Sequence, residues 1–381
     1  MNKIQPQLKN LGLFRVKKED LYIELALRIK KAPVNRYDFS KLYFSTGILG
    51  RYSEERAICF RLQNVHQVER IRVLIPDEAR EAGWVKLRLE AFVQGHGEFD
   101  VVSAALVPED GDELSRQAYL LGLKEWVRAQ VVHSESRQLA QVPHLPESLS
   151  LELTAACNLH CSHCSSHGDE NEHRMNNRRP AFSQDVLESL AHEVFPYLTL
   201  INLVGRGEPS MVSMPLWNRL FELCEAYNVL VTCVTNGTFV KQRFDERKIR
   251  WVDTLTFSID GITDEVFAAN RTGADLPTFK KNLDYYQTLR RGSDLLRRPR
   301  LGLSWTLKRN NIHEFPDFIR FAIESEADLL YVRHLLLFRP EDAEQSLVGE
   351  PELCNHYLSI GYALLEGQQI KLDVPPLAVA A

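Results

Sequence analysis

Strand-like and helix-like segments alternate without interruption from residue 149 to residue 335. Short apolar runs predict strands over 149–154, 198–204, 229–234, 254–259, 301–307 and 329–335. Amphipathic segments between them predict helices over 215–227, 239–250, 276–289 and 312–325. Repeated strand–helix–strand units form parallel sheets, because the crossover helix returns the chain to the same edge. Six such units predict an α/β fold, a partial (βα)6 TIM-like barrel, with ligands at the carboxyl ends of its strands.

The first 145 residues follow a different pattern, in which short segments such as Ile71–Ile75 alternate apolar and polar side chains. This period of two predicts half-buried strands, followed by an amphipathic helix over 112–131. We therefore expect a smaller, strand-rich accessory domain of β-sandwich type over 1–145 and the barrel over 146–340. Residues 341–381 are expected to form a C-terminal helical segment, which either stops before an auxiliary domain or belongs to a protein without one.

Three of the seven cysteines lie close together, in the segment Cys157-Asn-Leu-His-Cys161-Ser-His-Cys164 that follows the first barrel strand. The other four cysteines are scattered, which is not the pattern of a disulfide framework. The three neighbouring cysteines are therefore predicted to be metal ligands. Three thiolates around a four-iron cluster leave one iron open to a substrate or cofactor. A zinc site completed by one of the nearby histidines is the alternative at this stage.

Each of the next strands also ends in a polar or glycine-containing turn. These turns are Gly205-Arg-Gly-Glu-Pro209, Thr235-Asn-Gly-Thr238, and Ser258-Ile-Asp-Gly261 with Arg271-Thr-Gly273 after it. Any one of them alone is typical of an ordinary turn. Because they fall at consecutive strand ends of one predicted barrel, we expect them to meet at one site.

Together these motifs resemble the radical S-adenosylmethionine (radical SAM) superfamily. The resemblance rests on Cys157-x3-Cys161-x2-Cys164, Gly207-Glu208-Pro209, Thr235-Asn-Gly237 and Ser258-Ile-Asp260-Gly261. It is nearest to the branch of peptide-modifying enzymes, sulfatase maturases and molybdenum-cofactor cyclases. It implies a [4Fe–4S] cluster on the three cysteines and bound S-adenosyl-L-methionine, whose reductive cleavage gives a 5′-deoxyadenosyl radical that abstracts hydrogen from a substrate.

The resemblance also implies contacts to S-adenosylmethionine. The segment Arg206–Glu208 would bind the methionyl amino group, Ser258 and Arg271 would hold the carboxylate or the ribose, and Asn236 would lie near the cofactor. The implied cofactor contacts are therefore Arg206, Gly207, Glu208, Asn236, Ser258 and Arg271. No residue is assigned to catalysis itself.

Two positions depart from the family pattern. The residue before the third cysteine is usually aromatic and stacks near adenine, whereas here it is His163. The first glycine of the family's Gly-Gly-Glu-Pro motif is replaced by Arg206, which adds a positive charge close to the cofactor. Neither departure removes a cluster ligand, so we expect the activity to be retained.

The substrate is less constrained than the cofactor. Candidates facing the barrel interior are Trp305, Lys308, Arg333 and His334. Neighbours along a strand point to opposite faces, so Trp305 and Thr306 cannot both point inward, nor can Arg333 and His334. An arginine such as Arg333 could pair with a carboxylate or a phosphate. The substrate class stays open between a peptide, a sugar and a small metabolite, with flavodoxin or ferredoxin as the expected reductant.

Charge and hydropathy exclude several other classes of protein. The net charge of −5 disfavours nucleic acid as the main partner, and no apolar stretch approaches the roughly 20 residues that cross a bilayer. The sequence therefore predicts a cytoplasmic enzyme with no nucleic-acid or membrane partner. The competing hypothesis is a zinc-stabilised or cluster-bearing interaction protein without catalysis.

Overall fold

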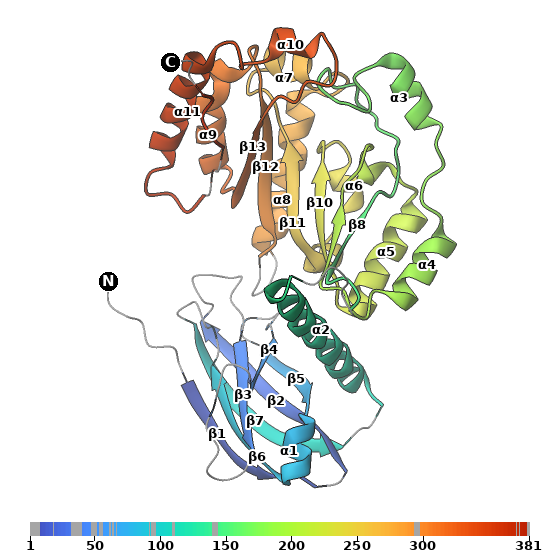
Figure 1. Cartoon of the computed structure of the whole chain (residues 1–381), viewed down its shortest axis with the longest axis vertical. Helices are drawn as coiled ribbons and strands as arrows, with labels where there is room; N and C mark the ends of the chain where they lie inside the picture. The colour runs from blue at the N-terminus through green and yellow to red at the C-terminus, as the bar shows by residue number, and fades with distance from the viewer. Residues whose placement is uncertain are drawn as a thin grey trace. The chain divides into compact units, whose positions relative to one another are not determined.

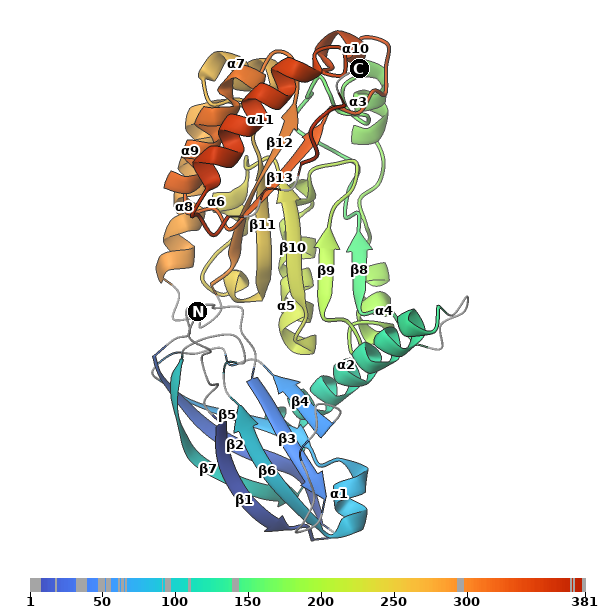
Figure 2. The same cartoon turned by 60° about the vertical axis from the view of Figure 1, so that its left-hand side comes forward.

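The fold is described from a computed structural model of the chain (Figures 1 and 2). It describes residues 8–17, 19–31, 40–46, 52, 56–60, 62, 65, 67–90, 92, 97–108, 111–138, 144–292, 298–370, 372 and 374–378. The contacts divide the chain into two compact units. The first unit comprises residues 1–147 with 192–199 and 293–298, and the second comprises 148–191, 200–292 and 299–381.

Two antiparallel sheets make up the strand-rich part of the first unit, as the alternating pattern predicts. One has the strand order β1-β6-β3-β4 and the other the order β5-β2-β7. Their strands are β1 (Leu8–Arg15), β2 (Asp20–Lys31), β3 (Ser40–Thr46), β4 (Ala57–Phe60), β5 (Val68–Leu74), β6 (Trp84–Glu90) and β7 (Glu98–Pro108). Alternate side chains of both sheets meet in one core, for example Leu25 of β2 with Leu87 of β6.

Two helices accompany these sheets, α1 (Asp77–Ala82) and the long α2 (Glu113–Ser136). Helix α2 extends five residues beyond the predicted end at residue 131. Its start is fixed by Asp112, whose side chain accepts a hydrogen bond from the backbone N–H of Ser115 at 2.8 Å.

The second unit is built on a six-stranded parallel sheet in the order β13-β12-β11-β10-β9-β8. Its strands are β8 (Ser148–Leu151), β9 (Leu200–Leu203), β10 (Leu230–Thr235), β11 (Val252–Ser258), β12 (Arg300–Leu307) and β13 (Leu329–His334). Figure 2 shows the strands side by side in chain order, without a partner joining β8 to β13. This is the predicted open parallel sheet, with all carboxyl ends on one edge.

Helices connect and cover these strands (Figure 1). They are α3 (Glu170–Asn177), α4 (Gln184–Glu193), α5 (Met214–Tyr227), α6 (Val240–Arg243), α7 (Asp264–Asn270), α8 (Leu276–Gly292), α9 (Phe315–Glu324), α10 (Asp342–Gln345) and α11 (Pro351–Leu365). Helix α11 packs against α9, where Gly361 allows a close approach. A Cβ atom at Gly361 would lie 2.5 Å from the ring of Phe315.

The helix predicted over 239–250 is not continuous. The chain forms only the short α6, becomes extended at Phe244, and resumes as a single 3₁₀ turn over Lys248–Trp251. The side chain of Asp245 accepts the backbone N–H of Arg247 at 3.1 Å and that of Lys248 at 2.8 Å. These local bonds replace helical ones, because an aspartate side chain competes with the backbone for N–H donors.

Within the described residues, no helix combines the length and the apolar character needed to cross a membrane.

Candidate functional site

A cavity of about 650 Å³ opens at the carboxyl edge of the parallel sheet. Its volume lies in the range of sites for small molecules and cofactors, about 300–1,000 Å³. Every strand contributes lining residues, from Ser150 on β8 to Arg333 on β13. The cysteine segment covers one side, and Cys157, Cys161 and Cys164 all line the cavity. The structure thus brings the predicted motifs to one place.

The cysteine segment is fastened to the neighbouring strand ends by hydrogen bonds. The backbone N–H of His160 donates to the carbonyl of Thr272 at 2.9 Å, and the side-chain amide of Asn158 donates to the hydroxyl of Thr238 at 3.2 Å. The backbone N–H of Cys157 donates to Asn177 of α3 at 2.9 Å. These bonds tie the loop after β8 to the loop after β10, to the loop between α7 and α8, and to α3.

Two of the thiols also accept N–H groups, as ligand sulfurs in iron–sulfur proteins do. Cys157 Sγ accepts from the backbone of Leu159 at 3.4 Å and from the amide of Asn236 at 4.0 Å. Cys161 Sγ accepts from the guanidinium of Arg271 at 3.8 Å. Burial raises the pKa of Cys157 to about 12, so a bound cation is needed to hold it as thiolate. The donor set therefore fits a thiolate-ligated cluster.

No three His, Cys, Asp or Glu side chains in the described part of the chain converge tightly enough to hold a single ion.

The segment 206–208 approaches the cysteine loop so closely that only glycine fits at position 207. A Cβ there would lie 2.4 Å from the carbonyl oxygens of Thr154 and Ala156. The next backbone N–H, that of Glu208, donates to the carbonyl of Ala156 at 2.8 Å. Backbone contact therefore joins the end of β9 to the residue before the first cysteine.

Glu208 is buried and accepts several hydrogen bonds. One carboxylate oxygen accepts the hydroxyls of Ser210 at 2.5 Å and Thr235 at 2.7 Å, and the other accepts the backbone N–H of Asn236 at 2.8 Å. Burial raises the pKa of Glu208 although these hydrogen bonds oppose the shift. Glu208 lines the cavity, and it also connects the ends of β9 and β10.

Arg206 lies at the cavity beside a carboxylate that offsets its charge. Its guanidinium makes two bonds to Glu152, at 2.9 and 3.1 Å, and its backbone N–H donates to the same carboxylate at 2.9 Å. Hydrogen bonding to Arg206 keeps the pKa of Glu152 below its usual value. The charge that Arg206 adds at the family's glycine position is thus balanced within the second unit.

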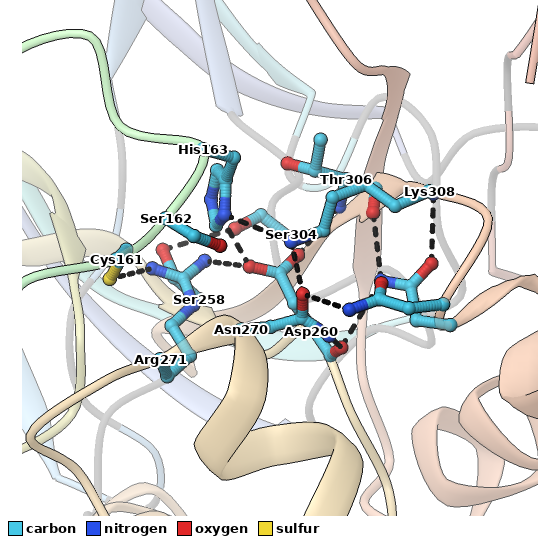
Figure 3. Close-up of polar contacts among 12 residues, drawn as sticks. Cys161, Ser162, His163, Ser258, Asp260, Asn270, Arg271, Ser304, Thr306 and Lys308 are labelled. Carbon is cyan, nitrogen blue, oxygen red and sulfur yellow. Dashed lines mark hydrogen bonds and ion pairs between the residues drawn. The ribbon is translucent and has the colours of Figure 1, made fainter. Parts of the chain in front are cut away.

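After β11, the carboxylate of Asp260 contacts the cationic side chains near the site (Figure 3). Asp260 is fully buried and forms an ion pair with Arg271 at 2.6 Å, and it accepts the backbone N–H of Thr306 at 2.7 Å. Burial raises the pKa of Asp260, but the nearby cations outweigh it and the pKa lies below its usual value. Arg271 therefore connects Asp260 to Cys161. Ser258, also at the cavity, accepts a hydrogen bond from Ser304 at 3.1 Å.

His163 lies between Asp260 and Lys308 (Figure 3). Its Nε2 is 3.4 Å from the carboxylate of Asp260, and its Nδ1 is 3.2 Å from the amine of Lys308. Burial lowers the pKa of His163 to about 3, so the ring is neutral near pH 7. In that state Nδ1 accepts from Lys308 and Nε2–H faces the carboxylate. Lys308, whose pKa burial lowers to about 8, also donates to Asn270.

The last two strands resolve the choice between neighbouring side chains. Thr306 and Arg333 line the cavity, whereas Trp305 is buried against Phe318 of α9 with ring centroids 4.7 Å apart. His334 points elsewhere and contacts the carbonyl of Pro375 at 2.8 Å. Of the four interior candidates, only Arg333 lines the cavity. Lys308 is buried and contacts His163, and the prediction that Trp305 or His334 faces the interior was wrong.

Comparison with known families identifies the part of the chain that holds the site. Residues 151–322 match the family model described as the Radical SAM superfamily. These residues form a radical SAM domain. Enzymes of this superfamily bind a [4Fe–4S] cluster and S-adenosylmethionine, and such a domain implies a partial TIM barrel, in agreement with the parallel sheet.

Solved structures with similarity to the chain include three radical SAM proteins. Streptococcus suis SuiB bound to S-adenosylmethionine is 14% identical, with 71% of this chain and 57% of SuiB covered and a TM-score of 0.44. Native anSMEcpe with bound AdoMet is 16% identical, with coverage of 60% and 64% and a TM-score of 0.46. TYW1 with a lysine-pyruvate adduct is 13% identical, with coverage of 64% and 82% and a TM-score of 0.41.

The chain thus spans less than two thirds of the length of SuiB and of anSMEcpe. No curated protein sequence matches it.

Sequence reasoning about the radical SAM domain missed the role of two residues. Asp260 was quoted within a motif but not singled out, and Asn270 was not considered, although both are fully buried at the site. A charged residue directly after a buried strand was the available signal for Asp260. No sequence signal pointed to Asn270. Only the fold brings it to Lys308, from which its side-chain oxygen accepts a hydrogen bond.

Proposed function

We propose that this chain is a radical SAM enzyme whose [4Fe–4S] cluster is held by Cys157, Cys161 and Cys164. The observation that carries the proposal is that all three thiols line one cavity with Glu208 and Arg271. The cysteines and Glu208 follow the strands β8 and β9, and Arg271 follows helix α7, so the arrangement depends on the whole sheet and its connections. The radical SAM domain over 151–322 supports the same assignment.

When bound, S-adenosylmethionine on a reduced cluster supplies a carbon-centred radical able to abstract hydrogen from an unactivated position. The residues of the chain would bind and orient S-adenosylmethionine and the cluster, and would shield them. Asn236 and Arg271 donate toward Cys157 and Cys161, which stabilises negative charge on sulfur. Ser258 and Arg271 are assigned to the carboxylate or ribose of S-adenosylmethionine. Glu208, with the backbone of 206–207, is assigned to its amino group.

The reaction and the partners belong to the same proposal. The substrate is a peptide, a sugar or a small metabolite, and the electron comes from a flavodoxin or ferredoxin. The net charge of −5 is consistent with a chain that has no nucleic-acid partner. We assign the protein to the cytoplasm, where thiols stay reduced.

Anaerobic reconstitution with iron and sulfide tests the proposal. We expect about four irons and four sulfides per chain, as three thiolates and one open iron require. Dithionite and S-adenosylmethionine should then give 5′-deoxyadenosine, measured by liquid chromatography. About one zinc per chain without sulfide would instead support the interaction protein, and a cluster without 5′-deoxyadenosine would refute the catalytic assignment.

A matched pair of variants separates cluster ligation from general damage. Cys161→Ser should lose most of the iron, because it removes a ligand. Cys233→Ser changes a thiol that is also buried but belongs to β10 and does not line the cavity, so it should keep the iron. Equal iron loss in both variants would contradict the ligand assignment.

A further inference from the structure

Most of the charged side chains that line the cavity already form ion pairs or hydrogen bonds with other residues. Arg206 is held by Glu152 at 2.9 Å, and Arg271 is held by Asp260 at 2.6 Å. Glu208 accepts hydrogen bonds on both carboxylate oxygens. These groups are fixed on the side of the cavity that also carries the cysteines.

Arg333 differs from the other arginines of the cavity. It lies near the end of β13 and is exposed, and within the described residues its guanidinium has no hydrogen bond or ion pair. In the sheet it is in register with Thr306 of β12, which also lines the cavity. A guanidinium with five open N–H donors thus stands next to a hydroxyl at the mouth of the site.

Large apolar side chains precede and follow this arginine along the chain. Tyr331 precedes it on the same face of β13, two residues away, and Leu336 and Phe338 follow in the next segment. All three line the cavity, and 50%, 59% and 56% of their respective surfaces are exposed. Exposed large apolar side chains beside a polar site are typical of binding surfaces. The part of the cavity wall formed by β13 and the segment after it is therefore apolar, and among the described residues it carries one arginine without a hydrogen-bond or ion-pair partner.

We propose that Arg333, next to Thr306, binds a carboxylate of the substrate, and that an apolar group beside this carboxylate packs on Leu336 and Phe338. This inference rests on the proposed radical function and adds the substrate class, an acid with an apolar substituent. Arginine matches a carboxylate with two parallel hydrogen bonds, which fixes orientation as well as position. Such an anchor on β13 fixes the substrate at the part of the cavity wall that Thr306 and Arg333 line.

A carboxylate fits this site better than a phosphate does. A phosphate monoester carries up to two negative charges near pH 7. Among the described residues that line the cavity, Arg333 is the only cation without an acidic partner, so one negative charge is balanced and a second is not.

Binding of three small probes tests the assignment. N-acetylphenylalanine, its amide and phenyl phosphate are titrated into the anaerobic holoenzyme with S-adenosylmethionine, and the dissociation constants are measured by NMR. We expect the acid to bind at least about ten-fold more tightly than the amide and more tightly than the phosphate, since hydrogen bonds between a guanidinium and a carboxylate are about twice as strong as those between neutral groups. Arg333→Gln should abolish the difference, and Arg333→Lys should keep part of it. Arg320→Gln, at an exposed arginine of α9, should leave it unchanged.

The same samples separate this inference from the proposed function. Cluster content and 5′-deoxyadenosine test the radical function, whereas acid–amide discrimination tests the subsite. Equal binding of acid and amide by the wild-type enzyme, or undiminished discrimination in Arg333→Gln, would overturn the subsite. It would also be overturned if Arg333→Gln weakened S-adenosylmethionine instead of the acid, because Arg333 would then belong to the cofactor site.

Discussion

The replacement Asp260→Asn tests the charge balance behind the cysteine segment. Asparagine has the same shape and can still accept the backbone N–H of Thr306, so the change removes mainly the negative charge. Arg271 would then be left buried without its ion pair at 2.6 Å. Removing one partner of a buried pair typically costs about 3–5 kcal/mol, because the other charge stays uncompensated. We expect the parallel sheet to lose that much stability.

Amide hydrogen exchange of β11 and β12, followed by mass spectrometry, measures this loss where it occurs. Since about 1.4 kcal/mol is a factor of ten, the slowest amides should exchange about two to nearly four orders of magnitude faster. Asp317→Asn is the control, because its ion pair with Arg320 at 2.5 Å is exposed and contributes about 1 kcal/mol at most. A change below about 1 kcal/mol in Asp260→Asn would refute the reasoning that this carboxylate balances Arg271.

Three further predictions concern the cavity wall, the cluster and the buried lysine. Gly207→Ala should destabilise the sheet by about 1–3 kcal/mol in urea unfolding, because its Cβ would meet backbone oxygens at 2.4 Å; Gly292→Ala, with open space around it, should not. In the untreated protein purified anaerobically, Cys161→Ala should lack the absorbance near 400 nm that Cys233→Ala retains. Burial lowers the pKa of Lys308 to about 8, so above pH 8 the unfolded chain binds more protons than the folded one. Stability should therefore rise from pH 8 to 10 through this residue, and Lys308→Met should flatten that rise in urea titrations.

Periodicity alone predicted most of the second unit. Apolar runs and amphipathic segments located the six strands within a few residues, because burial on both faces of a parallel sheet dictates composition. The break between α6 and the 3₁₀ turn was not predictable from this pattern. It depends on Asp245 bonding to nearby N–H groups, which leaves the apolar spacing unchanged.

The site could be located from sequence, but its internal contacts could not. Because neighbouring side chains along a strand point to opposite faces, the sequence predicted that only one of Trp305 and Thr306 faces inward, but not which one. The choice follows from packing: the indole fits against Phe318 of α9, and the hydroxyl is left for the polar cavity. In the same way, that Glu208 joins two strand ends depends on the spatial neighbours Ser210 and Thr235, which sequence spacing does not specify.

The two departures from the family pattern follow one physical rule. Arg206 brings a charge to the cavity, and Glu152 of the loop after β8 neutralises it at 2.9 Å. His163 brings a polar ring into a buried position, where Lys308 and Asp260 occupy its two nitrogens. A buried polar group without a partner costs about 1–3 kcal/mol, so His163 depends on its two partners, whereas Arg206 is exposed and its pair with Glu152 is a surface ion pair. Arg206→Gly leaves the carboxylate of Glu152 without its cationic partner, so we expect the double variant Arg206→Gly with Glu152→Gln to unfold at a slightly higher temperature than Arg206→Gly alone. Thermal unfolding of the wild type and both variants measures the difference, and equal unfolding temperatures of the single and double variants would contradict the coupling.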